Sequence, residues 1–293
     1  MWELTARYNS RAFWNQRFKK HGHTGEVDRL LYAYDQPQRL RAINEVLHRT
    51  RIPLDRGTKI LDIGCGTGDL IESLLNRAAP EIVGIDVSDE TIVYAQRRFS
   101  GRSGVKLLVM RLEDLNFLPA SFNLIFGINV LQHITDAREF STAIGKMVRI
   151  LRNGGYIFVM DFSPLKVKDR TPAPYVIIRP RDEYVKAFED KGCKLVCEFG
   201  LPRIGVRLYR LTFRIIVKTY RAVAHRFNQR PYAKTSSSTE VRETKETKNA
   251  IALRVLHIIG VVVLALAKPF DYTLIPFPGR LTDMRILVFK KAS

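Results

Sequence analysis

The sequence predicts an α/β fold with a doubly wound, mostly parallel sheet. Between residues 59 and 199, short apolar segments that are typical of buried strands alternate with segments of helical spacing. The glycine-rich stretch ILDIGCGTGDL at residues 60–70 joins the first of these strands to a helix, which is where such sheets bind nucleotides. A last strand-like segment, at 283–291, comes only after about eighty residues of different character. An insertion therefore separates it from the rest.

The expected strands are short and rich in branched apolar residues. In chain order they are KILDIG, EIVGIDVS, VKLLVMR, FNLIFGIN, YIFVMDF, CKLVCEF and DMRILVFKK. The helices expected among them are DLIESLLNRA, SDETIVYAQRRF, AREFSTAIGKMVRIL and RDEYVKAFEDKG, and residues 1–50 also read as helical. Ser88 is expected to cap the second of these four helices, and the NGG at 153–155 is expected to end the third.

Three glycines, Gly64, Gly66 and Gly68, let the loop turn tightly and come close to a ligand. Asp86 ends the next strand, where a carboxylate can accept hydrogen bonds from both hydroxyls of a ribose. A dinucleotide site would carry its third glycine one position later, where this sequence has Asp69. A carboxylate at that helix start would repel a pyrophosphate. The loop therefore favours a nucleoside without phosphate and with positive charge, such as S-adenosylmethionine.

The segments LDIGCGTGD and VGIDVS resemble motifs I and II of the class I S-adenosylmethionine-dependent methyltransferases of the small-molecule or lipid type. The segments LEDLNFLPASFNLIFGINVLQHI and RILRNGGYIFVMDF are similar to the family's third to fifth strands, and DMRILVFKK to its seventh, antiparallel strand. The resemblance covers residues 55–200 and 281–291. It implies a Rossmann-like seven-stranded sheet with an antiparallel last strand, and a helical insertion before that strand.

The resemblance also implies roles for individual residues. Asp62 and the loop from Gly64 to Gly68 would hold the methionine end of the cofactor, Asp86 its ribose, and Val87 its adenine. Arg111 stands where the family often has an acidic residue for the adenine amino group, so Glu113, Asp114 or a backbone carbonyl would take that contact. The predicted cofactor-binding residues are Asp62, Gly64, Cys65, Gly66, Gly68, Asp86, Val87, Glu113, Asp114 and Asn129.

Methyl transfer from a sulfonium requires mainly that the acceptor be positioned in line and that water be excluded. A hydroxyl acceptor also benefits from a general base, and His133 is the best candidate after the fourth strand, beside Asn129 and Gln132. His133 is expected within a helix, VLQHITDAREF, and the alternative is a half-buried structural histidine. The segment GINVLQHI lacks the [DN]PP[YF] signature of enzymes that methylate exocyclic amines of bases. Trp14, Tyr32 and Tyr34 are interpreted as a lid over the cofactor or as core aromatics.

The formal net charge of +19 indicates an anionic partner. Residues 203–234 carry nine Lys and Arg and no acidic residue. Arg203, Arg207, Arg210, Arg214, Lys218 and Arg221 fall within an arc of about 80° on a helix. With the apolar stretch at 250–267, residues 203–267 are interpreted as a hairpin that docks on an anionic membrane surface. The alternatives are a helical substrate-binding cap with a solvated basic face and, less favoured, binding of an RNA backbone.

Four regions follow: an N-terminal helical cap (1–54), the cofactor-binding core (55–200), the helical insertion (201–274) and the last strand (275–293). The predicted activity is methyl transfer to an oxygen of a lipid-linked or other anionic small molecule. The alternatives are an RNA methyltransferase and a binding protein without catalysis. Three cysteines and an N-terminus without an apolar run indicate a reducing, cytoplasmic location. The basic and apolar hairpin at 203–267 adds the expectation that the protein is peripheral on the inner face of a membrane. No metal site is expected, because neither His21 and His23 nor Cys193 and Cys197 lie in a ligand cluster.

Overall fold

The computed structural model describes residues 8–25, 28–78, 81–167, 169–228, 257–271 and 282–293. The chain forms two compact units. The first contains residues 1–27, 39–202 and 275–293, and the second contains residues 28–38 and 203–274. Each unit is described by itself below. Residues 229–256 of the predicted hairpin, including the first part of its apolar stretch, lie outside the described residues.

The first unit is built on a seven-stranded sheet with the order β3-β2-β1-β4-β5-β7-β6. All neighbouring strands run parallel except β7, which is antiparallel to β5 and to β6. The predicted fold class, including the antiparallel last strand, is therefore confirmed. The strands are β1 (Lys59–Ile63), β2 (Glu81–Asp86), β3 (Val105–Val109), β4 (Phe122–Ile128), β5 (Leu151–Phe162), β6 (Cys193–Leu201) and β7 (Met284–Lys291).

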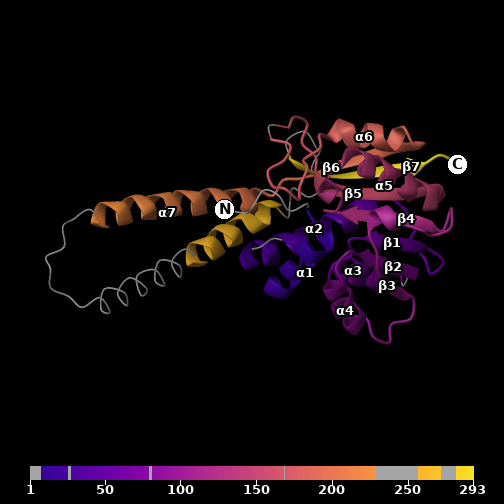
Figure 1. Ribbon diagram of the computed structural model, residues 1–293, viewed down its shortest axis with the longest axis horizontal. Coiled ribbons are helices and arrows are strands. Elements are labelled where there is room, and N and C mark those ends of the chain that lie inside the picture. Colours follow the sequence, from indigo (N-terminus) through magenta and orange to yellow (C-terminus); the bar gives the residue numbers. More distant parts are fainter. Residues whose placement is uncertain (1–7, 26–27, 79–80, 168, 229–256, 272–281) are drawn as a thin grey trace. The chain divides into compact units, whose positions relative to one another are not determined.

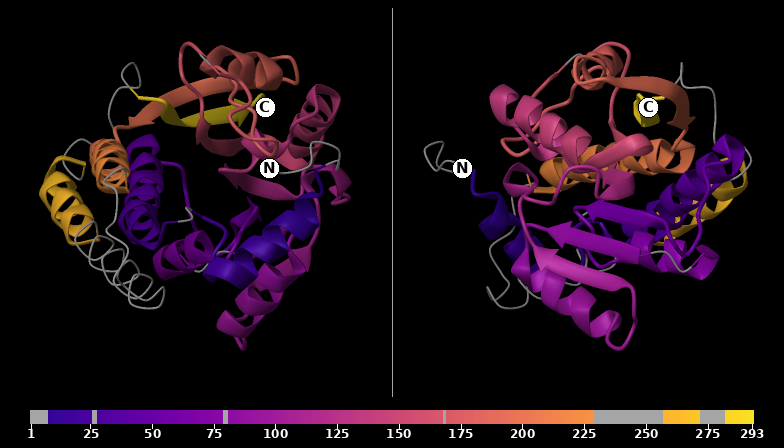
Figure 2. Two further views of the ribbon diagram at one scale, coloured as in Figure 1. Left: turned by 60° about the vertical axis from the view of Figure 1, so that its left-hand side comes forward. Right: turned by 90° about the vertical axis from the view of Figure 1, so that its right-hand side faces the viewer.

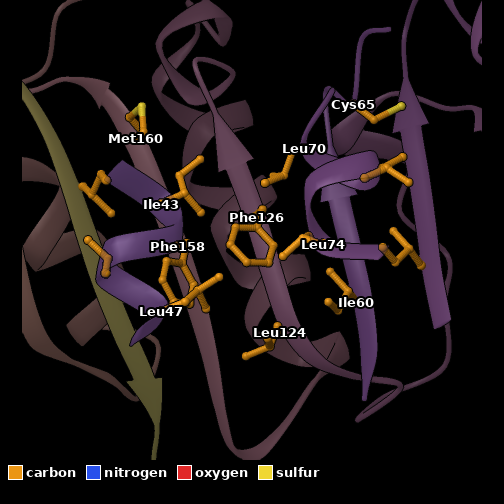
Figure 3. Packing of buried hydrophobic residues seen from close by; sticks show 14 of the residues in the cluster. Ile43, Leu47, Ile60, Cys65, Leu70, Leu74, Leu124, Phe126, Phe158 and Met160 are labelled. Atoms are coloured by element: carbon orange, nitrogen blue, oxygen red, sulfur yellow. The ribbon is translucent and has the colours of Figure 1, made fainter. Parts of the chain in front are cut away.

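Helices cover both faces of this sheet (Figures 1 and 2). Strand β5 shows how the sequence directs this, because Phe158 and Met160 enter one core while Ile157 and Val159 enter the other. The first core contains residues of α2 (Arg29–Thr50), α3 (Asp69–Ala78) and α4 (Asp89–Arg98), and Figure 3 shows part of it. The second core contains residues of α5 (Ala137–Ile150) and α6 (Arg181–Glu189). Helix α1 (Ser10–His21) lies along α4, joined to it by the Lys19–Glu90 ion pair of 2.9 Å.

Two local predictions hold and two fail. Ser88 caps α4 as expected, since its hydroxyl oxygen accepts from the Thr91 amide at 3.1 Å, and α3 has the predicted bounds. The NGG at 153–155 does not end α5, because the chain passes directly from Ile150 into β5, and Gly154 and Gly155 lie within that strand. His133 is not in a long helix but in a short 3₁₀ turn, Leu131–His133. Helix α5 begins only at Ala137, because Asp136 accepts hydrogen bonds from two of its first amides and so caps it.

The second unit is held by polar groups at the start of α7 (Ile204–Asn228). Arg203 makes two bonds, of 2.8 and 3.0 Å, to the Asp35 carboxylate, and both groups are buried. Asp271 accepts the amides of Ile204 and Gly205 at 2.7 and 2.8 Å and so caps α7. Around them lies a small apolar core of Leu31, Val206, Tyr209 and Leu264. None of the helices in the described residues has the length and apolar character needed to cross a membrane.

Gly84 in β2 determines how closely α3 packs on the sheet. A Cβ atom there would lie 2.7 Å from Leu107 Cδ2, 2.8 Å from Ile71 Cδ1 and 3.0 Å from Cys65 Sγ. These distances are shorter than van der Waals contact, so the helix and the glycine loop approach β2 only because a side chain is missing. Gly127 in β4 differs, since its nearest neighbour would be Met147 Cε at 4.0 Å.

Substitution of Gly84 by alanine is therefore expected to overpack the core and to lower the free energy of unfolding by about 1–3 kcal/mol. Gly127→Ala is the matched control, because it adds the same methyl group to a strand of the same sheet. It is expected to change stability by less than about 1 kcal/mol. Urea denaturation of both variants measures the difference, and equal losses would contradict the packing argument.

Candidate active site

The candidate site lies at the carboxyl ends of β1 and β4. These strands are neighbours in the sheet, but the chain continues from β1 toward β2 on one side and from β4 toward β5 on the other. Such a reversal of strand order separates the following loops and leaves room for a ligand between them. The two loops touch at one point, because a Cβ at Gly64 would lie 2.3 Å from Val130 Cγ2.

The glycine loop has a backbone that side chains would disturb. Gly64, Gly66 and Gly68 have φ angles of 67°, 53° and 84°, in the left-handed region that favours glycine. A Cβ at Gly68 would also lie 2.3 Å from Phe99 Cε2. The side chain of Cys65, between Gly64 and Gly66, is buried in the first core. This burial raises the pKa of its thiol well above the usual value. Only the backbone of Cys65 is therefore available to the predicted cofactor.

Two buried carboxylates flank this loop. Asp62 is 2% exposed, and its Oδ2 is buried without a hydrogen-bond partner. Burial raises the pKa of the Asp62 carboxyl well above its ordinary value, and the nearby charges of Asp86 and Asp69 raise it further. Asp86 accepts the amides of Gly66 and Ser88 at 3.0 and 2.9 Å, which partly offset the rise that burial causes in its pKa.

These features fit a nucleoside that carries positive charge. A buried carboxylate oxygen without a donor is stabilised by a cationic or N–H group brought by a ligand. The Asp86 carboxylate retains lone pairs beyond its two backbone bonds, so it can still accept ribose hydroxyls. The positive φ angles of Gly64, Gly66 and Gly68 turn the loop tightly, so that its backbone passes beside both carboxylates. The residues present are therefore suited to S-adenosylmethionine in the place that the sequence predicted.

The charge of Asp69, which was expected to repel a pyrophosphate, is partly offset by Arg98, whose Nη1 lies 2.6 Å from Asp69 Oδ1. Arg98 also donates to the Thr67 carbonyl oxygen at 2.8 Å, so it is fixed at the helix start. The distinction from a dinucleotide site therefore rests on the glycine spacing and on the buried Asp62 carboxyl, whose pKa the Asp69 charge still raises.

The remaining predicted cofactor residues lie in different surroundings. Asn129 follows β4 with a φ of 58°, and its Oδ1 is buried without a hydrogen-bond partner. Such a backbone conformation is uncommon for a residue other than glycine and is frequent at functional sites. Val87 is half-buried after Asp86. Glu113 pairs with Arg111 at 3.3 Å, and Asp114 is exposed, so nothing marks either carboxylate as the adenine contact.

His133 has a defined tautomer. Its Nδ1 lies 2.7 Å from the Tyr175 carbonyl oxygen, which can only accept, so Nδ1 carries the proton and donates it. Nε2 is therefore unprotonated, with Gln132 Nε2 at 3.4 Å. Burial lowers the pKa of His133 to about 4. The imidazole is neutral at physiological pH and has a lone pair on Nε2, as a proton acceptor requires.

The segment 175–179 holds the turn that carries His133. Arg179 donates to the carbonyl oxygens of Leu131 and Ile134 at 3.1 and 2.7 Å, on both sides of the histidine. Its guanidinium is buried and lies 3.9 Å from the centre of the Phe140 ring. The Ile177 amide donates to the Gln132 carbonyl oxygen at 2.8 Å. This segment was not predicted, although the long stretch between the fifth expected strand and the following helix was a signal.

Aromatic residues from the N-terminal segment of the chain, together with Tyr175, lie around His133. Trp14 contacts it edge-on at 4.8 Å between centroids, and Phe13 lies 4.4 Å from Tyr175. Tyr8 packs on Phe13 at 5.8 Å, and burial raises the pKa of its hydroxyl to about 12. Of the aromatics named from the sequence, Trp14 lies at the site. Tyr8 and Tyr175 were not predicted to lie at the site. Tyr8 stands just before α1 and Tyr175 in a loop, and neither belongs to a periodic pattern that would indicate its position.

Arg17 brings a positive charge to this aromatic cluster. Its guanidinium lies 5.5 Å from the Trp14 ring centre, and its Nη2 donates to the Gly25 carbonyl oxygen at 2.5 Å. Its Nε is buried without a hydrogen-bond acceptor. Such a donor favours an acidic group on any molecule that lies against the rings. Tyr34 differs, since its hydroxyl donates to Asp271 at 2.8 Å within the second unit.

Metal ligands are not gathered anywhere in the part of the chain that the structure describes, where no group of three or more His, Cys, Asp or Glu could hold an ion. His21 and His23 lie close, with ring centroids 6.1 Å apart. Cys193 and Cys197 both lie in β6, and burial raises the pKa of each thiol to about 11. They are thiols, not thiolates, at neutral pH.

Comparison with known proteins gives consistent likenesses. The model of a methyltransferase domain matches residues 60–155. An O-methyltransferase of Aspergillus nomiae is 32% identical over 155 residues, which are 50% of this chain and 66% of that protein. The ubiquinone biosynthesis O-methyltransferase of Xanthomonas euvesicatoria is 31% identical over 193 residues, which are 61% of this chain and 76% of that protein.

Solved structures share the fold at low identity. The [4+2]-cyclase SpnF has a TM-score of 0.55 at 18% identity, covering 86% of this chain and 80% of its own. Haemonchus contortus phosphoethanolamine N-methyltransferase 2, in complex with phosphomonomethylethanolamine and S-adenosylhomocysteine, has a TM-score of 0.53 at 15% identity. It covers 86% of this chain and 52% of its own. These likenesses show the fold alone, since one of the two proteins is a cyclase.

Asp86→Ala is expected to weaken S-adenosylmethionine binding at least tenfold, since each lost bond to a charged acceptor is worth about 1.5–3 kcal/mol. Isothermal titration calorimetry measures it. Glu81→Ala is the matched control, because Glu81 is an exposed carboxylate at the other end of the same strand. If both variants bound the donor as tightly as the unmodified protein, Asp86 would not hold the ribose.

Proposed function

This chain belongs to the class I S-adenosylmethionine-dependent methyltransferases, and from that premise we propose that it methylates an oxygen of an anionic acceptor, lipid-linked or small. The observation that carries the proposal is the neutral His133, with its unprotonated Nε2 set among aromatic rings. Two relatives named as O-methyltransferases support the choice of oxygen.

The cofactor-holding residues follow from the buried carboxylates and the bare loop. Asp62 and the loop at 64–68 would hold the methionine end, Asp86 the ribose and Val87 the adenine. When bound, S-adenosylmethionine supplies an activated methyl group, whose bond to sulfur breaks as the acceptor oxygen bonds to carbon, the electron pair staying on sulfur. Because the methyl group is already activated, the protein has mainly to orient the acceptor and exclude water.

His133 would take the hydroxyl proton of the acceptor on Nε2. Its Nδ1–H bond to the Tyr175 carbonyl oxygen, 2.7 Å long, fixes the ring and stabilises the imidazolium that forms. Arg179 acts as a positioning residue, since it binds the backbone on both sides of His133. The proton then passes from Nε2 to solvent after the product leaves.

The surroundings of His133 suggest the kind of acceptor. Phe13, Trp14 and Tyr175 offer ring faces and edges, which favour a flat apolar group beside the reacting oxygen. Arg17 offers a buried Nε donor and a positive charge, which favour a carboxylate, phosphate or similar anion on the same molecule. A phenolic acid combines these features in its simplest form.

Labelled S-adenosylmethionine, incubated with phenolic acids and with a lipid extract, is expected to give methyl ethers that mass spectrometry identifies. His133→Gln is expected to lower kcat about 100-fold or more while leaving donor affinity unchanged. His48→Gln is the matched control, because His48 is exposed on α2. Methyl groups found only on nitrogen or on RNA would overturn the proposal.

The pH dependence follows from the lowered pKa of His133. Above a pKa of about 4 the imidazole is neutral and able to accept a proton, so the acid limb of kcat/KM should fall near pH 4. An unfolded histidine titrates near 6.5, so the unfolded chain takes up a proton first and stability falls as pH drops from about 6.5 to about 4. Steady-state kinetics above the carboxyl pKa of a phenolic acid is expected to show kcat/KM unchanged from about pH 7 down to about pH 5, where a histidine of ordinary pKa would already be protonated. A midpoint near 6.5 would contradict the buried, neutral histidine.

A further inference from the structure

Helix α7 exposes basic and apolar side chains next to one another. Arg207, Arg210, Arg214 and Lys218 are exposed and span an arc of about 80° around the helix axis. Leu208 and Leu211 are 43% and 55% exposed and lie next to this basic arc on one side of the helix. Ile215, which is also exposed, lies between these two leucines around the helix axis. This surface of α7 is called the outer face below.

The opposite side of α7 is already used for packing within the second unit. Val206 and Tyr209 are buried with Leu264, which lies in the helix of residues 257–271. The two helices approach closely, since a Cβ at Gly260 would lie 2.5 Å from Tyr209 Cε2, and Figure 1 shows them side by side. The outer face is therefore not the side on which this unit has its core.

The helix of residues 257–271 has an exposed apolar side of its own. Ile258 is 61%, Val262 50%, Leu266 70% and Phe270 62% exposed, while Leu264 and Ala267 on the other side are buried. The exposed residues recur at intervals of four, as on one stripe of a helix. The acidic residue of this segment, Asp271, is buried as the cap of α7.

We propose that the outer face of α7 and the exposed apolar side of residues 257–271 dock on the surface of a bilayer that contains anionic phospholipid. The apolar side chains would enter the boundary between head groups and acyl chains, and the adjacent cations would meet lipid phosphates. The proposal goes beyond the methylation chemistry, because no residue of the candidate active site takes part.

Charge and exposure together favour a membrane over other occupants. An isologous dimer through this surface would bring the four cations of each copy into one interface, to which α7 contributes no acidic residue. RNA would meet the cations but would leave the exposed leucines and Phe270 in water. A lipid surface satisfies both kinds of side chain at once.

Co-sedimentation with phosphatidylcholine vesicles, with and without phosphatidylglycerol, tests the proposal on the full chain. Leu211→Glu combined with Leu266→Glu is expected to lower vesicle affinity at least tenfold. Arg214→Gln with Lys218→Gln is expected to lower affinity for the phosphatidylglycerol vesicles about 25-fold, since each cation contributes roughly a factor of five. High salt should weaken binding without abolishing it, because the apolar contact persists.

Matched controls lie in the first unit. Leu118 and Leu165 are 77% and 49% exposed, so Leu118→Glu combined with Leu165→Glu makes the same two kinds of change without touching the outer face. Arg102→Gln with Lys106→Gln removes the same charge from exposed positions. Vesicle affinity within about threefold of the unmodified protein is expected for both controls. Equal losses in controls and test variants would overturn the proposal.

Three further results would also overturn it: no vesicle binding by the unmodified protein, binding of RNA in preference to phosphatidylglycerol vesicles, or a dimer that Leu211→Glu dissociates. Circular dichroism and donor affinity show that each variant is folded. Methylation of a water-soluble phenolic acid is expected to be unchanged in the docking variants. Failure of the docking surface is therefore distinguishable from failure of the proposed reaction.

Discussion

The cofactor site depends on two carboxylates that the fold buries at the end of the sheet. Removing such a group from water costs several kcal/mol unless a donor or a cation compensates. Asp86 is compensated by two backbone amides, whereas Asp62 retains a buried oxygen without a donor. The nearby cation Arg98 is fixed on Asp69 and Thr67. Folding thus leaves a buried Asp62 oxygen that a cation or an N–H donor on a ligand would stabilise, and this supports the proposed place of the positively charged nucleoside.

The sheet could be predicted because its signals are local. Strands buried on both faces read as continuous apolar runs, and the helices that cover them repeat apolar residues every three or four positions, so each pattern needs only its own segment. Asp62 and Asp86 lie at the ends of β1 and β2, and the glycine loop follows β1 directly, so their positions could be predicted for the same reason. The end of α5 was predicted wrongly because Gly154 and Gly155 are typical of a helix C-terminus. In the structure β5 begins at Leu151, so both glycines lie within the strand.

The acceptor side could not be predicted, because it is assembled from distant segments. His133 is set by a carbonyl of residue 175, by Arg179 and by the ring of Trp14, which are more than forty positions away along the chain. None of these contacts has a periodicity, and the cap at Asp136 that separates His133 from α5 competes with an apparently continuous helical pattern. Tertiary contacts, rather than local preference, give the histidine its tautomer and its neutral state.

The insertion between β6 and β7 explains how a second unit coexists with an undisturbed core. Leu201 and Met284 are paired neighbours in the antiparallel ladder, so residues 202–283 leave and re-enter the sheet at adjacent positions, as the loop of a hairpin does. Lengthening such a loop adds little closure entropy, and the ladder on either side keeps its register. The polar start of α7, with Arg203 on Asp35 and Asp271 on its first amides, gives this insertion a fixed beginning of its own. Its exposed apolar and basic side chains can therefore be altered by substitution without changing the strands that carry the chemistry.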